Sequence, residues 1–150
     1  MRLTAFAAGL TLPAAALAAA AATVEPGGWT HISKMDSAVI PGVPGFLLGG
    51  AKKPRTRKSC LSAIEAASDP QALFRSKKGA CVTRRFTMAG GKIDSLAICT
   101  DDRLDSPLTV TSTGSYTPTS YSLRTVSSGT RHGKPMRIVS SASGRRTHGC

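Results

Sequence analysis

Hydrophobic and polar residues alternate along much of the chain that follows residue 28. Alternation with a period of two is typical of β-strands that bury one face of a sheet. Outside the stretch between the second and third cysteines, four segments show it: residues 29–35, 107–112, 119–126 and 136–142. The first segment carries the only tryptophan, Trp29, which we expect to anchor the core.

The stretch from Cys81 to Cys99 predicts a β-hairpin that turns at residues 89–91. Directly opposed residues of an antiparallel pair are close enough to form a disulfide, so we expect Cys81 to face Cys99. The same register brings Arg84 near Asp94 across the two strands.

This register gives the hairpin one apolar face and one mostly polar face, which carries both cysteines. The apolar face must be covered, either by the protein's own core or by a ligand. Together with the tryptophan, it forms the candidate apolar binding face: Trp29, Val82, Phe86, Met88, Leu96 and Ile98.

Residues 38–50 interrupt the strand pattern. They hold two prolines and four glycines, which argues against a central strand or a helix. We expect an irregular loop with apolar side chains, and residues 39–48 are a candidate lid over the sheet. A turn at 113–115 and a loop over 127–134 separate the last three strand segments.

Two short helices are also expected. Residues 62–65 have the sequence of a capping box, which predicts a helix to about Ala67. Asp69 and Pro70 predict a second helical turn that reaches Phe74. We therefore predict a mainly β fold, with about six to eight antiparallel strands in a meander that forms a curved sheet or a small barrel.

The first 22 residues differ from the rest. A positively charged start precedes an apolar run and a series of small residues, which is typical of a secretory signal peptide cleaved near residues 18–22. The apolar run is short and rich in alanine, so it is a poor membrane span. Residues 23–150 are the right length for a single exported β-rich domain without a transmembrane segment.

All four cysteines follow this segment, and an even number in an exported chain indicates two disulfides. Four cysteines allow three pairings. The hairpin register favours Cys81–Cys99, which leaves Cys60–Cys150. Because the cysteines and histidines form no C-x-x-C or H-x-x-x-H pattern, we expect no metal site.

Lys and Arg outnumber Asp and Glu by 20 to 8, which gives a net charge of +12. An exported protein with this charge attracts anions such as lipopolysaccharide, phospholipid or acidic glycans. The alternative is that the basic residues only keep an edge strand soluble. The candidate anion-binding residues are Lys52, Lys53, Arg55, Arg57, Lys58, Lys77, Lys78, Arg145 and Arg146.

Four features together resemble a known family. They are Pro26-Gly-Gly-Trp29, Cys60-Leu-Ser before a short helix, the Cys81…Cys99 pair, and the ending Ser143-Gly-Arg-Arg-Thr-His-Gly-Cys150. The chain resembles the exported, mainly proteobacterial family named only as domain of unknown function 3617. The resemblance implies a periplasmic or secreted β-rich domain of a Gram-negative bacterium. It implies no known reaction and supplies no catalytic residues.

No catalytic pattern accompanies these features. His31, His132 and His148 are scattered, and neither G-x-S-x-G nor H-E-x-x-H occurs. We therefore expect a non-catalytic protein without a cofactor. The leading hypothesis is a binding module for a hydrophobic or amphipathic small molecule, held on the apolar face of the sheet.

The alternative is electrostatic binding to an anionic surface or polymer of the cell envelope through the basic residues. Nucleic acid is not expected as a partner, because the chain carries an export signal and no aromatic residues interleave with its basic run.

Overall fold

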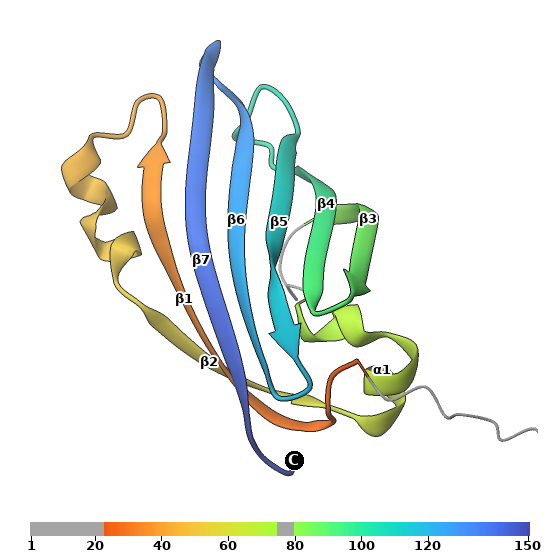
Figure 1. The fold of residues 1–150 in the computed structure, drawn as a ribbon. Helices are drawn as coiled ribbons and strands as arrows, with labels where there is room; N and C mark the ends of the chain where they lie inside the picture. Colours follow the sequence, from red (N-terminus) through yellow and green to blue (C-terminus); the bar gives the residue numbers. More distant parts are fainter. Residues whose placement is uncertain (1–22, 75–79) are drawn as a thin grey trace, which may run out of the picture.

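The structure, a computed structural model, describes residues 23–74 and 80–150 (Figure 1). Its main feature is one antiparallel sheet of seven strands, in the order β2-β1-β7-β6-β5-β4-β3. The strands are β1 (Gly27–Val39), β2 (Arg55–Leu61), β3 (Ala80–Ala89), β4 (Lys92–Thr100), β5 (Leu108–Thr117), β6 (Ser120–Arg131) and β7 (Lys134–His148). Because β2 and β3 end the sheet on opposite sides, the sheet is open, and of the two predicted shapes the curved sheet is correct and the barrel is not.

Strands β3 to β7 form the predicted meander, each paired with the next in the chain. The first hairpin does not continue it. Strand β1 pairs with β7 along almost its whole length, and β2 pairs with β1 on the outside. The first and last strands of the sheet in chain order, β1 and β7, are therefore neighbours, and they lie between β2 and β6.

The turn predicted at residues 113–115 and the loop predicted over 127–134 lie mostly within β-strands. Gly114 lies inside β5, where a Cβ atom would overlap the carbonyl oxygen of Ser122 and the side chain of Leu123, so this glycine allows close strand packing. Residues 127–134 belong mostly to β6 and β7, which turn at His132 and Gly133 with φ of 53° and 66°.

Helical segments are short: η1 (Gly45–Lys52), α1 (Ala63–Ser68) and η2 (Pro70–Leu73), of which η1 and η2 are 3-10 helices. The capping box of α1 is confirmed: Ser62 Oγ accepts from the Glu65 amide at 3.2 Å, and Glu65 Oε2 accepts from the Ser62 amide at 2.9 Å. The second predicted helical turn is η2. The prediction that residues 38–50 contain no helix is wrong, because η1 forms there.

The core lies at one end of the concave face of the sheet, where α1 and η2 cover it. We call this region the packed end: Val24, Trp29, Leu61, Ala66, Leu73, Ile93 and Tyr121. Trp29 is only 1% exposed, as expected of a core anchor. Its indole ring stacks against Tyr121 with 6.3 Å between ring centroids.

The β3–β4 hairpin begins in the predicted register and then leaves it. Cys81 faces Cys99, and Thr83 faces Ala97. Arg84 is then an extra residue in β3, a β-bulge, so that Arg85 faces the next residue of β4.

The bulge reverses the sides on which later residues of β3 lie. Phe86 and Met88 therefore share the concave side with the cysteines and pack against the core. Val82, Leu96 and Ile98 lie on the convex side, so the predicted apolar face is not one surface. The bulge also changes the arginine that pairs with Asp94.

That ion pair joins Asp94 to Arg85 and not to Arg84. The Arg85 guanidinium approaches Asp94 Oδ1 at 2.9 Å and 3.0 Å. The physical reason is again the extra residue in β3. It moves Arg85 into the position opposite Leu96, where the predicted register places Arg84.

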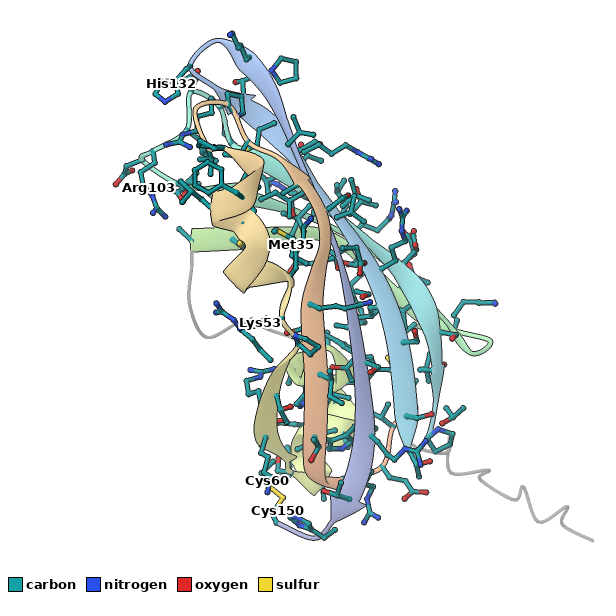
Figure 2. All side chains as sticks on the ribbon, turned by 90° about the vertical axis from the view of Figure 1, so that its left-hand side faces the viewer. Met35, Lys53, Cys60, Arg103, His132 and Cys150 are labelled. Carbon is teal, nitrogen blue, oxygen red and sulfur yellow. A yellow bond between two sulfur atoms is a disulfide. The ribbon has the colours of Figure 1, made fainter. Side chains whose placement is uncertain are left out.

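Both expected disulfides are present. Cys81–Cys99 joins β3 to β4 with Cα atoms 4.0 Å apart. Cys60–Cys150 joins β2 to the end of the chain with Cα atoms 5.6 Å apart, at the end of the molecule opposite His132 (Figure 2). Two disulfides are consistent with a protein that functions outside the cytoplasm.

Candidate functional site

The concave face of the sheet carries a half-open cleft of about 800 Å³, to which all seven strands contribute. Side chains in the middle of its floor are small, and this makes the face hollow: Ser95, Ala97, Val110, Ser112, Thr125 and Ala142. Ser112 and Thr125 hydrogen-bond to each other through their hydroxyls at 2.8 Å, so these two polar side chains of the floor have partners within it.

Aromatic and aliphatic side chains form the wall of the cleft beside the packed end. Phe74 lies 4.9 Å from Tyr121 in an edge-to-face contact and 6.1 Å from Phe86, measured between ring centroids. Leu73 and Leu123 complete this wall. The arrangement offers an apolar surface on which the hydrocarbon part of a ligand can lie.

Positive charge lies on the rim of the cleft that β2 forms. Arg55 and Arg57 alternate along edge strand β2 and both line the cleft, next to Ser33 and His31 of β1. Among the residues that the structure describes, no ion pair involves either arginine. The rim can therefore bind a carboxylate or phosphate, which guanidinium groups bind strongly.

A short hydrogen-bonded cluster joins three strands under this rim. His31 Nδ1 lies 2.6 Å from the Tyr121 hydroxyl, and His31 Nε2 lies 2.6 Å from Ser59 Oγ. Burial, together with the charge of Arg57, lowers the pKa of His31 to about 4. Burial raises the pKa of Tyr121 to about 12, so both side chains are neutral at neutral pH.

Sequence reasoning did not find this cluster. Ser59 and Tyr121 lie 28 and 90 positions from His31 in the chain. No motif links them. Ser59 reaches His31 through the pairing of β2 with β1, and Tyr121 reaches it across β7, which pairs with both β1 and β6. The one available signal was the place of His31 beside Trp29 on the inner side of the first predicted strand.

The predicted anion-binding residues do not form one strip. Lys58 follows Arg57 in β2, so strand alternation turns it to the convex side. Lys52 ends η1, and Lys53 follows it outside the cleft. Lys77 and Lys78 lie outside the described residues, as does the predicted signal peptide.

The predicted lid lies elsewhere. None of residues 39–48 lines the cleft, and η1 lies alongside the outer edge of β1 (Figure 1). Of the predicted apolar face, only Phe86 lines the cleft. In the described ranges no three His, Cys, Asp or Glu side chains are grouped as metal ligands, and no helix there has the length and apolar character to cross a membrane.

Comparison with known families gives a match over most of the chain. A family model described as "Protein of unknown function (DUF3617)" matches residues 24–150. The chain belongs to the DUF3617 family. No curated protein and no solved structure matches it. Family membership therefore assigns no activity, and the site of this DUF3617 protein must be interpreted from its own residues.

In this DUF3617 protein, the C-terminal motif that carried the resemblance has structural roles. A Cβ atom on Gly144 would overlap the Tyr121 ring, so only glycine leaves room for that ring to reach His31. The Arg146 guanidinium donates to the Pro26 carbonyl at 2.7 Å and lies 3.6 Å from Glu25.

Two other residues of this motif complete the description. Cys150 closes the long disulfide. Arg145 lies on the opposite side of the sheet from the cleft, beside Thr30 and Ser120 in the strand pairing. The motif therefore stabilises the packed end, and its two arginines are not part of the cleft.

Proposed function

We propose that this DUF3617 protein binds an amphipathic molecule with an anionic headgroup in the concave cleft, without catalysis. The observation that supports this best is that one cleft combines an apolar wall with two arginines, Arg55 and Arg57, on its β2 rim. The cleft volume of about 800 Å³ is within the range of small-molecule sites. Long-chain fatty acids and lysophospholipids have this chemistry. The disulfides and the export expected from the sequence favour the periplasm, or secretion from a Gram-negative cell, as the place of binding.

The contact between Ser59 and His31 has the distance of a nucleophile and its general base. A general base works best when its pKa is near the pH of the reaction. The pKa of His31 is about 4, so its basicity is low at neutral pH. In addition, His31 Nδ1 contacts the Tyr121 hydroxyl and not a carboxylate that could stabilise a protonated imidazole. We therefore infer that the cluster holds β1, β2 and β6 together beneath the rim and does not act in catalysis.

A fluorescent long-chain fatty acid, with the corresponding fatty alcohol as an uncharged competitor, tests the role of the arginines. We expect the purified disulfide-bonded protein to bind the fatty acid, and Arg55→Gln/Arg57→Gln to raise its Kd about tenfold or more, since each lost contact is a charge-assisted hydrogen bond. Affinity for the alcohol should change little. Arg124→Gln is the matched control, because Arg124 is exposed on the convex side.

A second pair of variants tests the location. Ala97→Phe fills the floor of the cleft and should abolish binding, whereas Leu96→Phe, on the convex side of the same strand, should leave it unchanged. Equal binding by Ala97→Phe and the unmodified protein would reject the cleft as the site.

A further inference from the structure

One edge of the sheet, formed by the second half of β1, by η1 and by the lysine after it, combines exposed apolar side chains with basic ones. We call it the η1 edge: Val39, Phe46, Leu47, Lys52 and Lys53. Strand β2 pairs only with Gly27–Ser33 of β1, so η1 lies where β2 does not reach (Figure 1).

Large apolar side chains on the η1 edge are exposed. Phe46 is 81% exposed, Val39 68% and Leu47 63%, and no residue of η1 is buried. Exposed apolar groups that cluster in this way mark interaction sites more often than isolated ones do. These side chains add little to the core, so their presence on the surface favours a binding role.

Residues 37–64 carry charge of one sign only, and the acidic residue before them, Asp36 of β1, is paired with Lys34. The chain carries no Asp or Glu between residues 37 and 64, while five basic residues follow one another closely from Lys52 to Lys58. Arg55 and Arg57 line the cleft and Lys58 lies on the convex side of β2, which leaves Lys52 and Lys53 at the end of η1. Figure 2, which shows this edge toward the viewer, places Lys53 just below η1.

We propose that the η1 edge docks the protein on the surface of an anionic lipid bilayer, with Phe46 and Leu47 inserted among the lipids and Lys52 and Lys53 on the headgroups. An apolar tip with cations behind it is the arrangement by which peripheral proteins bind such surfaces. An anionic polymer would attract the lysines but would gain nothing from the exposed phenylalanine.

This docking is independent of ligand binding in the cleft, which uses other residues. With two inserted side chains and two adjacent lysines, we expect weak, reversible association that falls as salt increases. Neutral bilayers should bind the protein much less, because the electrostatic contribution is then absent.

Co-sedimentation with vesicles of equal parts phosphatidylcholine and phosphatidylglycerol tests the proposal, with pure phosphatidylcholine vesicles as the neutral comparison. Phe46→Ser/Leu47→Ser should lower the partition coefficient about tenfold or more. The control is Val82→Ser, which removes a side chain 56% exposed on the opposite edge strand and should change nothing. Both variants should unfold at the temperature of the unmodified protein, since the altered side chains are exposed.

Phe46→Trp supplies an independent readout. Trp29 is buried, so the new indole should alone shift to shorter wavelength and be quenched by brominated lipid in the anionic vesicles. Vesicle binding that is unchanged by Phe46→Ser/Leu47→Ser, or a Phe46→Trp variant whose added indole is not quenched by brominated lipid, would overturn the proposal. Retention on heparin that matches vesicle binding in every variant would also overturn it, in favour of an anionic polymer.

Discussion

The packed end and the η1 edge use apolar residues in opposite ways. At the packed end, Trp29 and Tyr121 are buried and stacked, and the neighbouring His31 has hydrogen-bond partners on both ring nitrogens. On the η1 edge, Phe46 and Leu47 extend into solvent. Stability therefore depends on the packed end, and the exposed apolar residues of the η1 edge are available for binding. The cleft is intermediate, because it combines an apolar wall with the charge of Arg55 and Arg57 on its β2 rim.

Loss of the long disulfide should have the largest effect on the packed end. Cys60→Ser/Cys150→Ser opens a loop of 90 residues, and we expect the free energy of unfolding to fall by about 4.5 kcal/mol. Cys81→Ser/Cys99→Ser opens a loop of 18 and should cost about 3 kcal/mol. Urea unfolding measures both, and a larger loss from the short loop would contradict the account.

Acid should weaken the packed end through His31. The unfolded chain binds a proton on this histidine below about pH 6.5, whereas in the folded protein its pKa is about 4. The contribution of His31 to the free energy of unfolding is therefore fully present above pH 6.5. It is lost as the pH decreases toward 4, by up to about 3 kcal/mol.

Urea unfolding at pH 7 and at pH 4.5 checks this effect. His31→Gln should lose much less stability on acidification than the unmodified protein, even though it starts less stable. His132→Asn, at the exposed β6–β7 turn, should keep the full pH dependence. Parallel pH profiles for the unmodified protein and His31→Gln would refute the assignment.

Adding one methyl group to a glycine should lower the free energy of unfolding at the packed end and leave it almost unchanged on the η1 edge. Gly144→Ala forces a Cβ atom into the Tyr121 ring and should destabilise the protein by about 2 kcal/mol. Gly45→Ala, at the start of η1, meets no atom within 4 Å and should change stability by less than about 0.5 kcal/mol. A similar cost at both positions in thermal unfolding would show that the η1 edge is packed more tightly than described.

The smallest effect on stability is expected from the exposed tip. Phe46→Ser/Leu47→Ser should change the free energy of unfolding by less than about 0.5 kcal/mol, because neither side chain is buried. Leu73→Ser, at the packed end, is the comparison and should cost about 3 kcal/mol or more. A large loss from the tip variant in urea unfolding would assign the tip to the core.

Local chemistry could be predicted from the sequence, and distant contacts could not, except for Cys60–Cys150, which followed once Cys81 was paired with Cys99. The capping box at Ser62 and the facing of Cys81 and Cys99 depend on residues close in the chain or on simple alternation, and both predictions are confirmed. The bulge at Arg84 has no signal in composition, yet it moves Phe86 to the other side of the sheet. Gly114 was interpreted as a turn because glycine commonly is one, but here it makes room for the neighbouring strand.

The candidate site depends on the strand order. Arg55 and Arg57 were identified as anion-binding candidates from their charge and their alternate positions in the chain, but their place on the rim follows from the pairing of β2 with β1. The wall contributed by Phe74 depends on how η2 packs over the sheet, which no periodicity predicts. The lid prediction was wrong because η1 lies along the sheet edge and not over its face.

The most direct test of the central claim is a backbone amide NMR titration with a monomeric fatty acid below its micelle concentration. The account predicts that shifts are confined to the cleft, at amides such as those of Ala97, Ser112 and Thr125, and that Gly45 and Gly49 of η1 stay unchanged. Saturable shifts at η1 with none in the cleft, or no shifts at all, would contradict it.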